Sequence, residues 1–97
     1  MTIKKIYKEI NKLVLKYCFN SKFITTIQIF PKEHQVLKDI KSKEDTVSID
    51  VQYWKNGKVI KSYSKRCNNN DNAIFILQQE LPIFVKECEE YASQATN

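Results

Sequence analysis

Two groups of residues in this chain have the types and the spacing to bind a polyanion. In the first group, Lys4, Lys8, Lys12 and Lys16 recur every four residues, an interval that lines side chains up along one face of an α-helix. Lysines gathered on one surface release counterions from phosphates and attract polyanions without contacting bases. This row predicts nucleic-acid binding, and its competing interpretation is an ordinary solvated helix face.

The second group lies in the stretch YWKNGKVIKSYSKR, residues 53–66. It holds the single Trp, two of the five Tyr and five of the sixteen basic residues. The pair Asn56-Gly57 tolerates the positive φ that both central positions of a type I′ turn require. Because apolar residues flank this pair on both sides, residues 58–67 should return as the partner strand of residues 46–55.

A two-residue turn decides which hairpin side chains share a face, because cross-strand partners follow by counting outward from it. Trp54 then pairs with Val59, and the count runs without interruption to Val47 with Arg66. The face expected to pack against helices consists of Val47, Ile49, Val51, Tyr53, Ile60, Ser62 and Ser64. The face expected to stay open consists of Ser48, Asp50, Gln52, Trp54, Val59, Lys61, Tyr63 and Lys65.

The open face of the predicted hairpin combines two aromatic rings with two lysines. Aromatic rings stack on bases with about 1–3 kcal/mol per base, and neighbouring cations hold the phosphates. The competing interpretation is a cross-strand patch of Trp54 and Tyr63 that residues 31–45 cover or that a homodimer buries. The predicted binding residues, for nucleic acid or an acidic protein or nucleoprotein surface, are Trp54, Lys58, Lys61, Tyr63, Lys65, Lys4, Lys8, Lys12 and Lys16.

The net charge of +5 is divided unevenly along the chain. Residues 1–22 hold six Lys and one Glu, and residues 46–67 hold four Lys, one Arg and one Asp. Residues 23–45 are neutral, whereas residues 68–97 hold one Lys and five acids. Because Arg66 is the single Arg, bidentate reading of guanine is scarce, and binding should be led by the phosphate backbone or by shape.

Residues that commonly carry catalysis or hold metals are few and scattered. His34 is the single histidine, and Cys18, Cys67 and Cys88 are widely spaced with no C-x-x-C pair, so neither a catalytic triad nor a zinc site is indicated. Gly57 is the single glycine, which excludes a glycine-rich phosphate loop. We therefore predict a protein that is not an enzyme and uses no metal or cofactor.

Hydrophobic periodicity predicts the elements that position these residues. Residues 3–18 place apolar side chains at helical spacing opposite the lysine row, with Thr2 as the N-cap. Residues 23–30, FITTIQIF, indicate a strand that stops at Pro31. Because this strand is apolar on both faces, we expect it in the centre of the sheet or covered on both sides. Residues 31–45 fit either a helical turn or a short strand.

A second amphipathic helix is predicted over residues 72–92, with Asn70 or Asp71 as its cap. Pro82 lies inside this pattern and removes one hydrogen bond, at a cost of roughly 3 kcal/mol in a helix interior. Because the apolar phase continues across Pro82, we expect a kink and not a break. Residues 93–97 are expected to fray.

The predicted order is helix, strand, uncertain connection, strand, strand, helix. Both amphipathic helices need an apolar surface, and one sheet face is the only surface large enough. We therefore predict an α+β fold, a single domain of residues 1–97, with an antiparallel sheet and both helices on one face. No apolar run approaches the roughly 18–20 residues of a membrane span, and lysines interrupt the start of the chain, so we expect a cytoplasmic protein without membrane contact.

This order of elements resembles that of double-stranded-RNA-binding domains, and the resemblance rests on topology. Where that family has a Gly-Pro-x-His element, this chain has FPKEH, which contains Pro31 and His34 but no glycine. The last helix of that family begins with a lysine-rich motif, whereas the last predicted helix here begins with NNNDNA. The same order occurs in small phage inhibitor proteins. Two functions are therefore expected: a binder of nucleic acid or nucleoprotein, or alternatively an anti-CRISPR-like inhibitor from a phage or plasmid that uses the same face on a protein.

Overall fold

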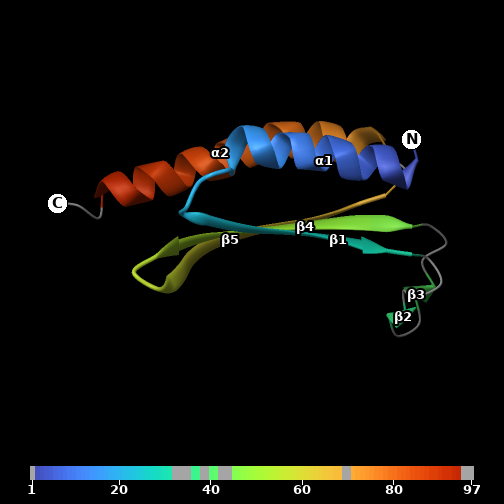
Figure 1. Ribbon diagram of the computed structural model, residues 1–97, viewed down its shortest axis with the longest axis horizontal. Helices are drawn as coiled ribbons and strands as arrows, with labels where there is room; N and C mark the ends of the chain where they lie inside the picture. Colours follow the sequence, from blue (N-terminus) through green and yellow to red (C-terminus); the bar gives the residue numbers. More distant parts are fainter. Residues whose placement is uncertain (1, 32–35, 38–39, 42–44, 69–70, 95–97) are drawn as a thin grey trace.

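Two helices lie over an antiparallel sheet, which confirms the predicted α+β fold (Figure 1). The computed structural model describes residues 2–31, 36–37, 40–41, 45–68 and 71–94. The elements are α1 (Ile3–Tyr17), β1 (Phe23–Phe30), β2 (Val36–Leu37), β3 (Ile40–Lys41), β4 (Thr46–Lys55), β5 (Lys58–Cys67) and α2 (Asp71–Gln94). In the part of the chain that is described, neither helix is long and apolar enough to cross a membrane.

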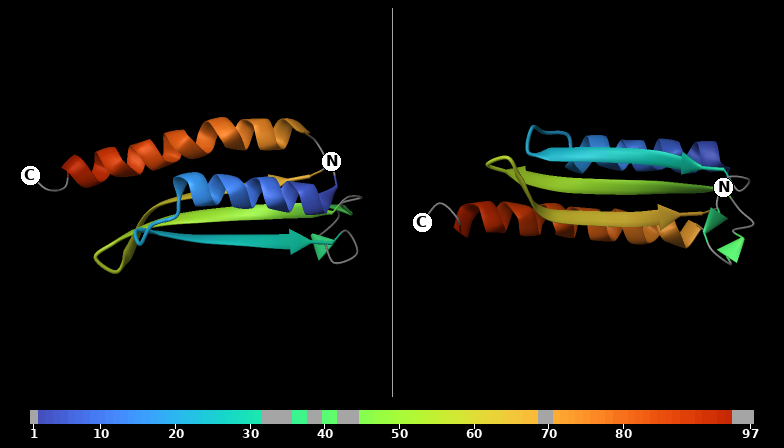
Figure 2. Two further views of the ribbon diagram at one scale, coloured as in Figure 1. Left: turned by 45° about the horizontal axis from the view of Figure 1, so that its top comes forward. Right: turned by 90° about the horizontal axis from the view of Figure 1, so that it is seen from below.

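The three-stranded sheet has the order β1-β4-β5, so β4 is its central strand. Both helices cover the same face, with α1 against β1 and β4 and α2 against β5 (Figure 2). β1 is therefore an edge strand, and the prediction of a central or doubly covered position for residues 23–30 is wrong. Ile24 of β1 lies on the face without helices and is half-exposed. Single exposed apolar residues are common at protein surfaces.

The first helix starts at the predicted cap and buries the predicted face. The side-chain oxygen of Thr2 accepts a hydrogen bond from the N–H of Lys5 at 3.3 Å, which satisfies one of the unpaired donors of the first turn. Ile6, Ile10 and Val14 follow at four-residue spacing and are buried. The lysine-rich side of α1 therefore faces away from the sheet.

The second helix runs without a break through Pro82. Its buried residues lie at helical spacing on one face and are Ile74, Leu77, Leu81, Phe84, Val85 and Cys88. Burial on both sides of Pro82 holds the helix together although one intrahelical hydrogen bond is lost. The helix ends at Gln94, later than the predicted residue 92. Residues 95–97 and the cap candidate Asn70 lie outside the described residues.

The connection between β1 and β4 contains a short hairpin, in which Val36 pairs with Lys41 and Leu37 with Ile40. The strand alternative therefore holds for these residues and the helical turn does not. The hairpin lies beyond the end of the main sheet (Figure 1). His34 lies outside the described residues.

Aromatic rings link the sheet to α2 within the core. Phe23 of β1 stands with its ring centroid 5.5 Å from that of Tyr53 and 6.4 Å from that of Phe84. Tyr63 of β5 reaches Phe84 at 5.7 Å. Tilted ring pairs at these separations add about 0.5–1.5 kcal/mol each beyond their buried area, so Phe84 ties α2 to both edge strands.

Candidate functional site

The hairpin between β4 and β5 has the predicted two-residue turn. Asn56 and Gly57 both take positive φ, at 55° and 75°, and Lys55 pairs with Lys58 across the turn. Positive φ at both central positions is the requirement of the type I′ turn, whose twist matches that of the flanking strands. The start of the predicted register is therefore confirmed.

A β-bulge interrupts the register directly after the turn. Trp54 pairs with Val59 as predicted, but the next residue of β4, Tyr53, pairs with Lys61. Ile60 is the extra residue on the bulged strand, and it packs against the core with partial burial. A bulge of this kind shifts every later pair by one position and so exchanges the two faces of the strand.

The bulge places three of the predicted binding residues under the helices. Lys61 pairs with Tyr53, Tyr63 with Val51, and Lys65 with Ile49, and these β4 residues are all buried in the core. The prediction that put Lys61, Tyr63 and Lys65 on the open face is therefore wrong.

Burial explains why the chain prefers the bulged register. An uninterrupted count would have placed Ser62, Ser64 and Arg66 beneath the helices. The bulge instead brings the ring of Tyr63 and the fully buried Cys67 to that side. Apolar surface removed from water is worth about 25 cal/mol per Å², whereas an unpaired buried guanidinium would be costly.

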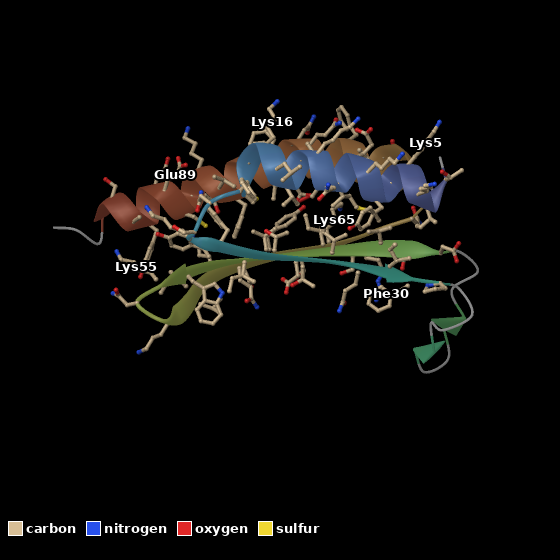
Figure 3. All side chains as sticks on the ribbon, in the orientation of Figure 1. Lys5, Lys16, Phe30, Lys55, Lys65 and Glu89 are labelled. Carbon is tan, nitrogen blue, oxygen red and sulfur yellow. The ribbon has the colours of Figure 1, made fainter. Side chains whose placement is uncertain are left out.

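The two repositioned lysines face acidic residues of α2. Lys61 Nζ lies 3.7 Å from Glu87 Oε2, and Lys65 Nζ lies 4.0 Å from Glu80 Oε1. Lys65 is visible between the sheet and the helices in Figure 3. Partly exposed pairs of this kind contribute about 0–1 kcal/mol each. Their larger consequence is that the positive charge of β5 is matched by negative charge on α2.

Tyr63 has its hydroxyl buried, and no described residue hydrogen-bonds to it. Burial, followed by the negative charge of Glu80 and then by Cys67, raises the pKa of Tyr63 to about 12. The ring packs on Phe84. Tyr63 is therefore part of the packing between β5 and α2 and offers no stacking surface to a base.

The open face of the sheet carries polar contacts within and between its strands. Trp54 Nε1 donates a hydrogen bond to Gln52 Oε1 at 3.1 Å on the same strand. Ser64 Oγ donates to Asp50 Oδ1 at 3.0 Å across β4 and β5. Trp54 is partly buried, so the open face presents one indole whose N–H already has a partner.

A contact between an aromatic ring and a cation on this open face was not predicted from the sequence. The guanidinium carbon of Arg66 lies 4.8 Å from the centroid of the Phe30 ring, within the range of a cation–π contact. Phe30 projects below the sheet, away from the helices (Figure 3). The contact depends on the pairing of β1 with β4 and on the bulge, and no short sequence pattern indicates either of them. The spacing of residues in the sequence could therefore not predict that Phe30 and Arg66 meet.

The lysine row of α1 (Lys4, Lys8, Lys12 and Lys16) is exposed over its whole length. At 1.5 Å per residue, it extends about 18 Å. Glu9 is the single acid of α1, and it pairs with Lys12 at 3.2 Å. Lys5 is also exposed, and Lys5 and Lys16 both point away from the sheet (Figure 3).

The structure therefore separates the predicted binding residues into three places. The lysine row lies on the outer surface of α1. Trp54 lies on the opposite, open face of the sheet, and Lys58 follows the hairpin turn in an exposed position. Lys61, Tyr63 and Lys65 lie between β5 and α2. The combined aromatic and basic sheet face that the sequence predicted does not form.

The three cysteines are unbridged and buried. Burial, and secondarily Cys88, raises the pKa of Cys18 to about 11, and burial is also the main reason why the pKa values of Cys67 and Cys88 are raised. Such thiols stay protonated near neutral pH and are poor nucleophiles. Among the described residues, no group of His, Cys, Asp and Glu side chains is arranged to hold a metal ion.

No protein-family model, curated protein sequence or solved structure matches this chain.

Proposed function

We propose that this protein is a non-enzymatic module that binds the phosphate backbone of nucleic acid, alone or in a nucleoprotein, through the lysine row of α1. The observation that carries the proposal is a difference in how the lysines of β5 and the lysines of the row are paired with acidic residues. Lys61 and Lys65 face glutamates of α2, whereas the lysine row shares its helix with one acid, Glu9. The charge of Lys4, Lys8 and Lys16, which are outside the Lys12–Glu9 pair, is therefore available to a partner.

The dimensions of the row support contact with several phosphates. Duplex DNA carries one charge per about 1.7 Å of its axis, and the row is about 18 Å long. Lysine ammonium groups act as point charges that do not read base edges. Binding through this row is therefore expected to be insensitive to sequence and steeply dependent on salt.

The test compares two triple variants that lower the net charge equally. Lys4→Gln/Lys8→Gln/Lys16→Gln removes charge from the row, and Lys22→Gln/Lys55→Gln/Lys86→Gln removes it from elsewhere on the chain. Fluorescence anisotropy with a labelled duplex is measured between about 50 and 200 mM salt. Each lost phosphate contact flattens the slope of log K against log salt by about 0.9, so the row variant should lose about 2.7.

The matched control should keep most of the wild-type slope, because its three lysines are not in the row. Equal losses in both variants would show that only total charge matters and would remove the lysine row from the proposal. Absence of binding to duplex DNA, duplex RNA and single strands at the lowest salt would overturn the proposed function itself.

A further inference from the structure

The outer edge of β1 presents main-chain groups with which no described strand pairs. The N–H of Trp54 donates to the carbonyl of Lys22 at 2.8 Å, and the register from there along β1 and β4 is unbroken. Antiparallel partners alternate between residues that bond to each other and residues that do not. Consequently Thr25, Ile27 and Ile29 direct their N–H and C=O groups outward, away from β4.

This edge lacks the features that usually protect a sheet edge. β1 spans eight residues, FITTIQIF, with no charged residue, proline or bulge. Natural edge strands are commonly protected by charge, by proline or by a bulge. The other edge strand, β5, has three lysines, Arg66 and a bulge. An uncharged strand of this length is a ready template for a further strand.

A cavity of about 460 Å³ lies beside this edge, between β1 and the end of α1. Its lining residues are Val14, Cys18, Phe19, Asn20, Ser21, Phe23 and Thr25. Phe23 and Thr25 are on the helix-covered face of β1, because they pair with Tyr53 and Val51 of the core. Thr25 Oγ1 is buried, and no described residue hydrogen-bonds to it.

Exposed apolar side chains lie at the cavity and farther along the edge. Phe19 is 78 % exposed, Leu15 is 53 % exposed, and Ile29 of β1 is 50 % exposed. Leu15 precedes Cys18 by three residues, which places it on the neighbouring part of the helix surface. A strand added at the β1 edge would direct alternate side chains toward α1, where the cavity and these residues would receive them.

The charge around this groove is positive. Side chains of an added strand that point away from α1 meet the open face, where Arg66 lies beside Phe30 of β1 and Asp50 is hydrogen-bonded to Ser64. Lys22 directly precedes β1 and is exposed. β1 contributes no acid, and Glu9 of α1 is paired with Lys12. A partner with carboxylates would therefore be favoured over a basic one.

We propose that the outer edge of β1 and the adjoining cavity bind an extended segment of a protein partner that adds as a further strand, with apolar side chains toward α1 alternating with acidic residues. Main-chain hydrogen bonds to Thr25, Ile27 and Ile29 hold the segment, and the cavity selects its apolar side chains. This peptide site is independent of the nucleic-acid proposal.

A second copy of this chain does not suit the edge. A second copy would offer β1 itself as the added strand, and β1 has no carboxylate to match the positive charge beside the edge.

The probe is a labelled peptide of alternating Val and Glu, compared with one of alternating Val and Lys. The Glu peptide is expected to bind more tightly and to slow amide hydrogen exchange at Thr25, Ile27 and Ile29. A Glu peptide N-methylated at alternate amides cannot complete the ladder and should not bind. Preference for the Lys peptide, or binding by the N-methylated one, would overturn the proposal.

Matched variants locate the site. Leu15→Ala/Phe19→Ala should weaken the Glu peptide about tenfold, which corresponds to about 1.4 kcal/mol. Phe75→Ala/Ile83→Ala removes similarly exposed side chains from α2 and should leave binding unchanged. Equal weakening by both pairs, or protection of β5 amides instead of β1 amides, would exclude this edge. Peptide-independent dimers in size-exclusion chromatography that protect β1 would show that a second copy occupies it.

Discussion

The lysines of α1 and the lysines of β5 have the same chemistry but different surroundings. The lysine row of α1 is exposed on the outside of the molecule, whereas Lys61 and Lys65 lie between the sheet and α2 and face Glu87 and Glu80. Both segments carry a similar net charge in the sequence. Charge per segment therefore does not show which charges a partner can reach, because the fold brings an acidic helix over one basic segment only.

Deleting Ile60 tests the bulge that produces this difference. Without Ile60, Lys61 follows Val59 directly, so a regular two-residue hairpin pairs Lys61 with Tyr53 as the bulged one does. We expect the fold to persist, with Lys61 and Lys65 still directed toward α2. The partial burial of Ile60 is lost, at a cost of about 1.5–2 kcal/mol in urea denaturation. Loss of the near-ultraviolet circular dichroism signal would contradict this expectation.

Most of the fold was predictable because its signals are local. Thr2, the helical spacing of Ile6 and Ile10, and the pair Asn56-Gly57 each specify an element within a few residues. The bulge was not predictable, because Ile60 is an ordinary strand residue. The choice of register depends on Phe84, which is distant in sequence and receives the ring of Tyr63.

The position of β1 and the distribution of the site depended on the same kind of long-range information. Apolar residues on both faces of β1 indicated burial, yet the strand is an edge, and Ile24 and Ile29 are half-exposed. The lysine row was correctly placed on an exposed helix face because helical spacing alone determines it. The sheet face was predicted wrongly because one extra residue reverses a strand.

Removing the acids of α2 should make the two groups of lysines more alike. In Glu80→Gln/Glu87→Gln, Lys61 and Lys65 lose their partners. If the proposed phosphate binding is correct, affinity for duplex DNA should rise about tenfold, or about 1.4 kcal/mol, with a steeper salt slope. A matched variant, Glu89→Gln/Glu90→Gln, makes the same charge change on α2 and controls for net charge. An equal gain in both variants would contradict the role of the ion pairs.

The smallest expected effect comes from a variant that keeps the ring of Tyr63 and removes its hydroxyl group. Tyr63→Phe keeps the packing on Phe84 and removes a buried hydroxyl to which no described residue hydrogen-bonds. The free energy of unfolding near pH 7 should stay equal or rise by up to about 1 kcal/mol. A loss of more than that amount would show that the hydroxyl has a stabilising partner.

The pH dependence of the same variant has a defined sign. Burial raises the pKa of Tyr63 in the folded state to about 12, above the value of about 10 in an unfolded chain. The folded state therefore holds the phenol proton more tightly than the unfolded chain does. The resulting contribution to the free energy of unfolding is complete below about pH 10 and is lost as the pH rises through about 12. Every other titratable group is common to both proteins, so the difference between wild type and Tyr63→Phe isolates Tyr63. Urea denaturation at a series of pH values should show the wild type losing stability faster than Tyr63→Phe above about pH 10, and parallel curves would mean that the hydroxyl is open to solvent in solution.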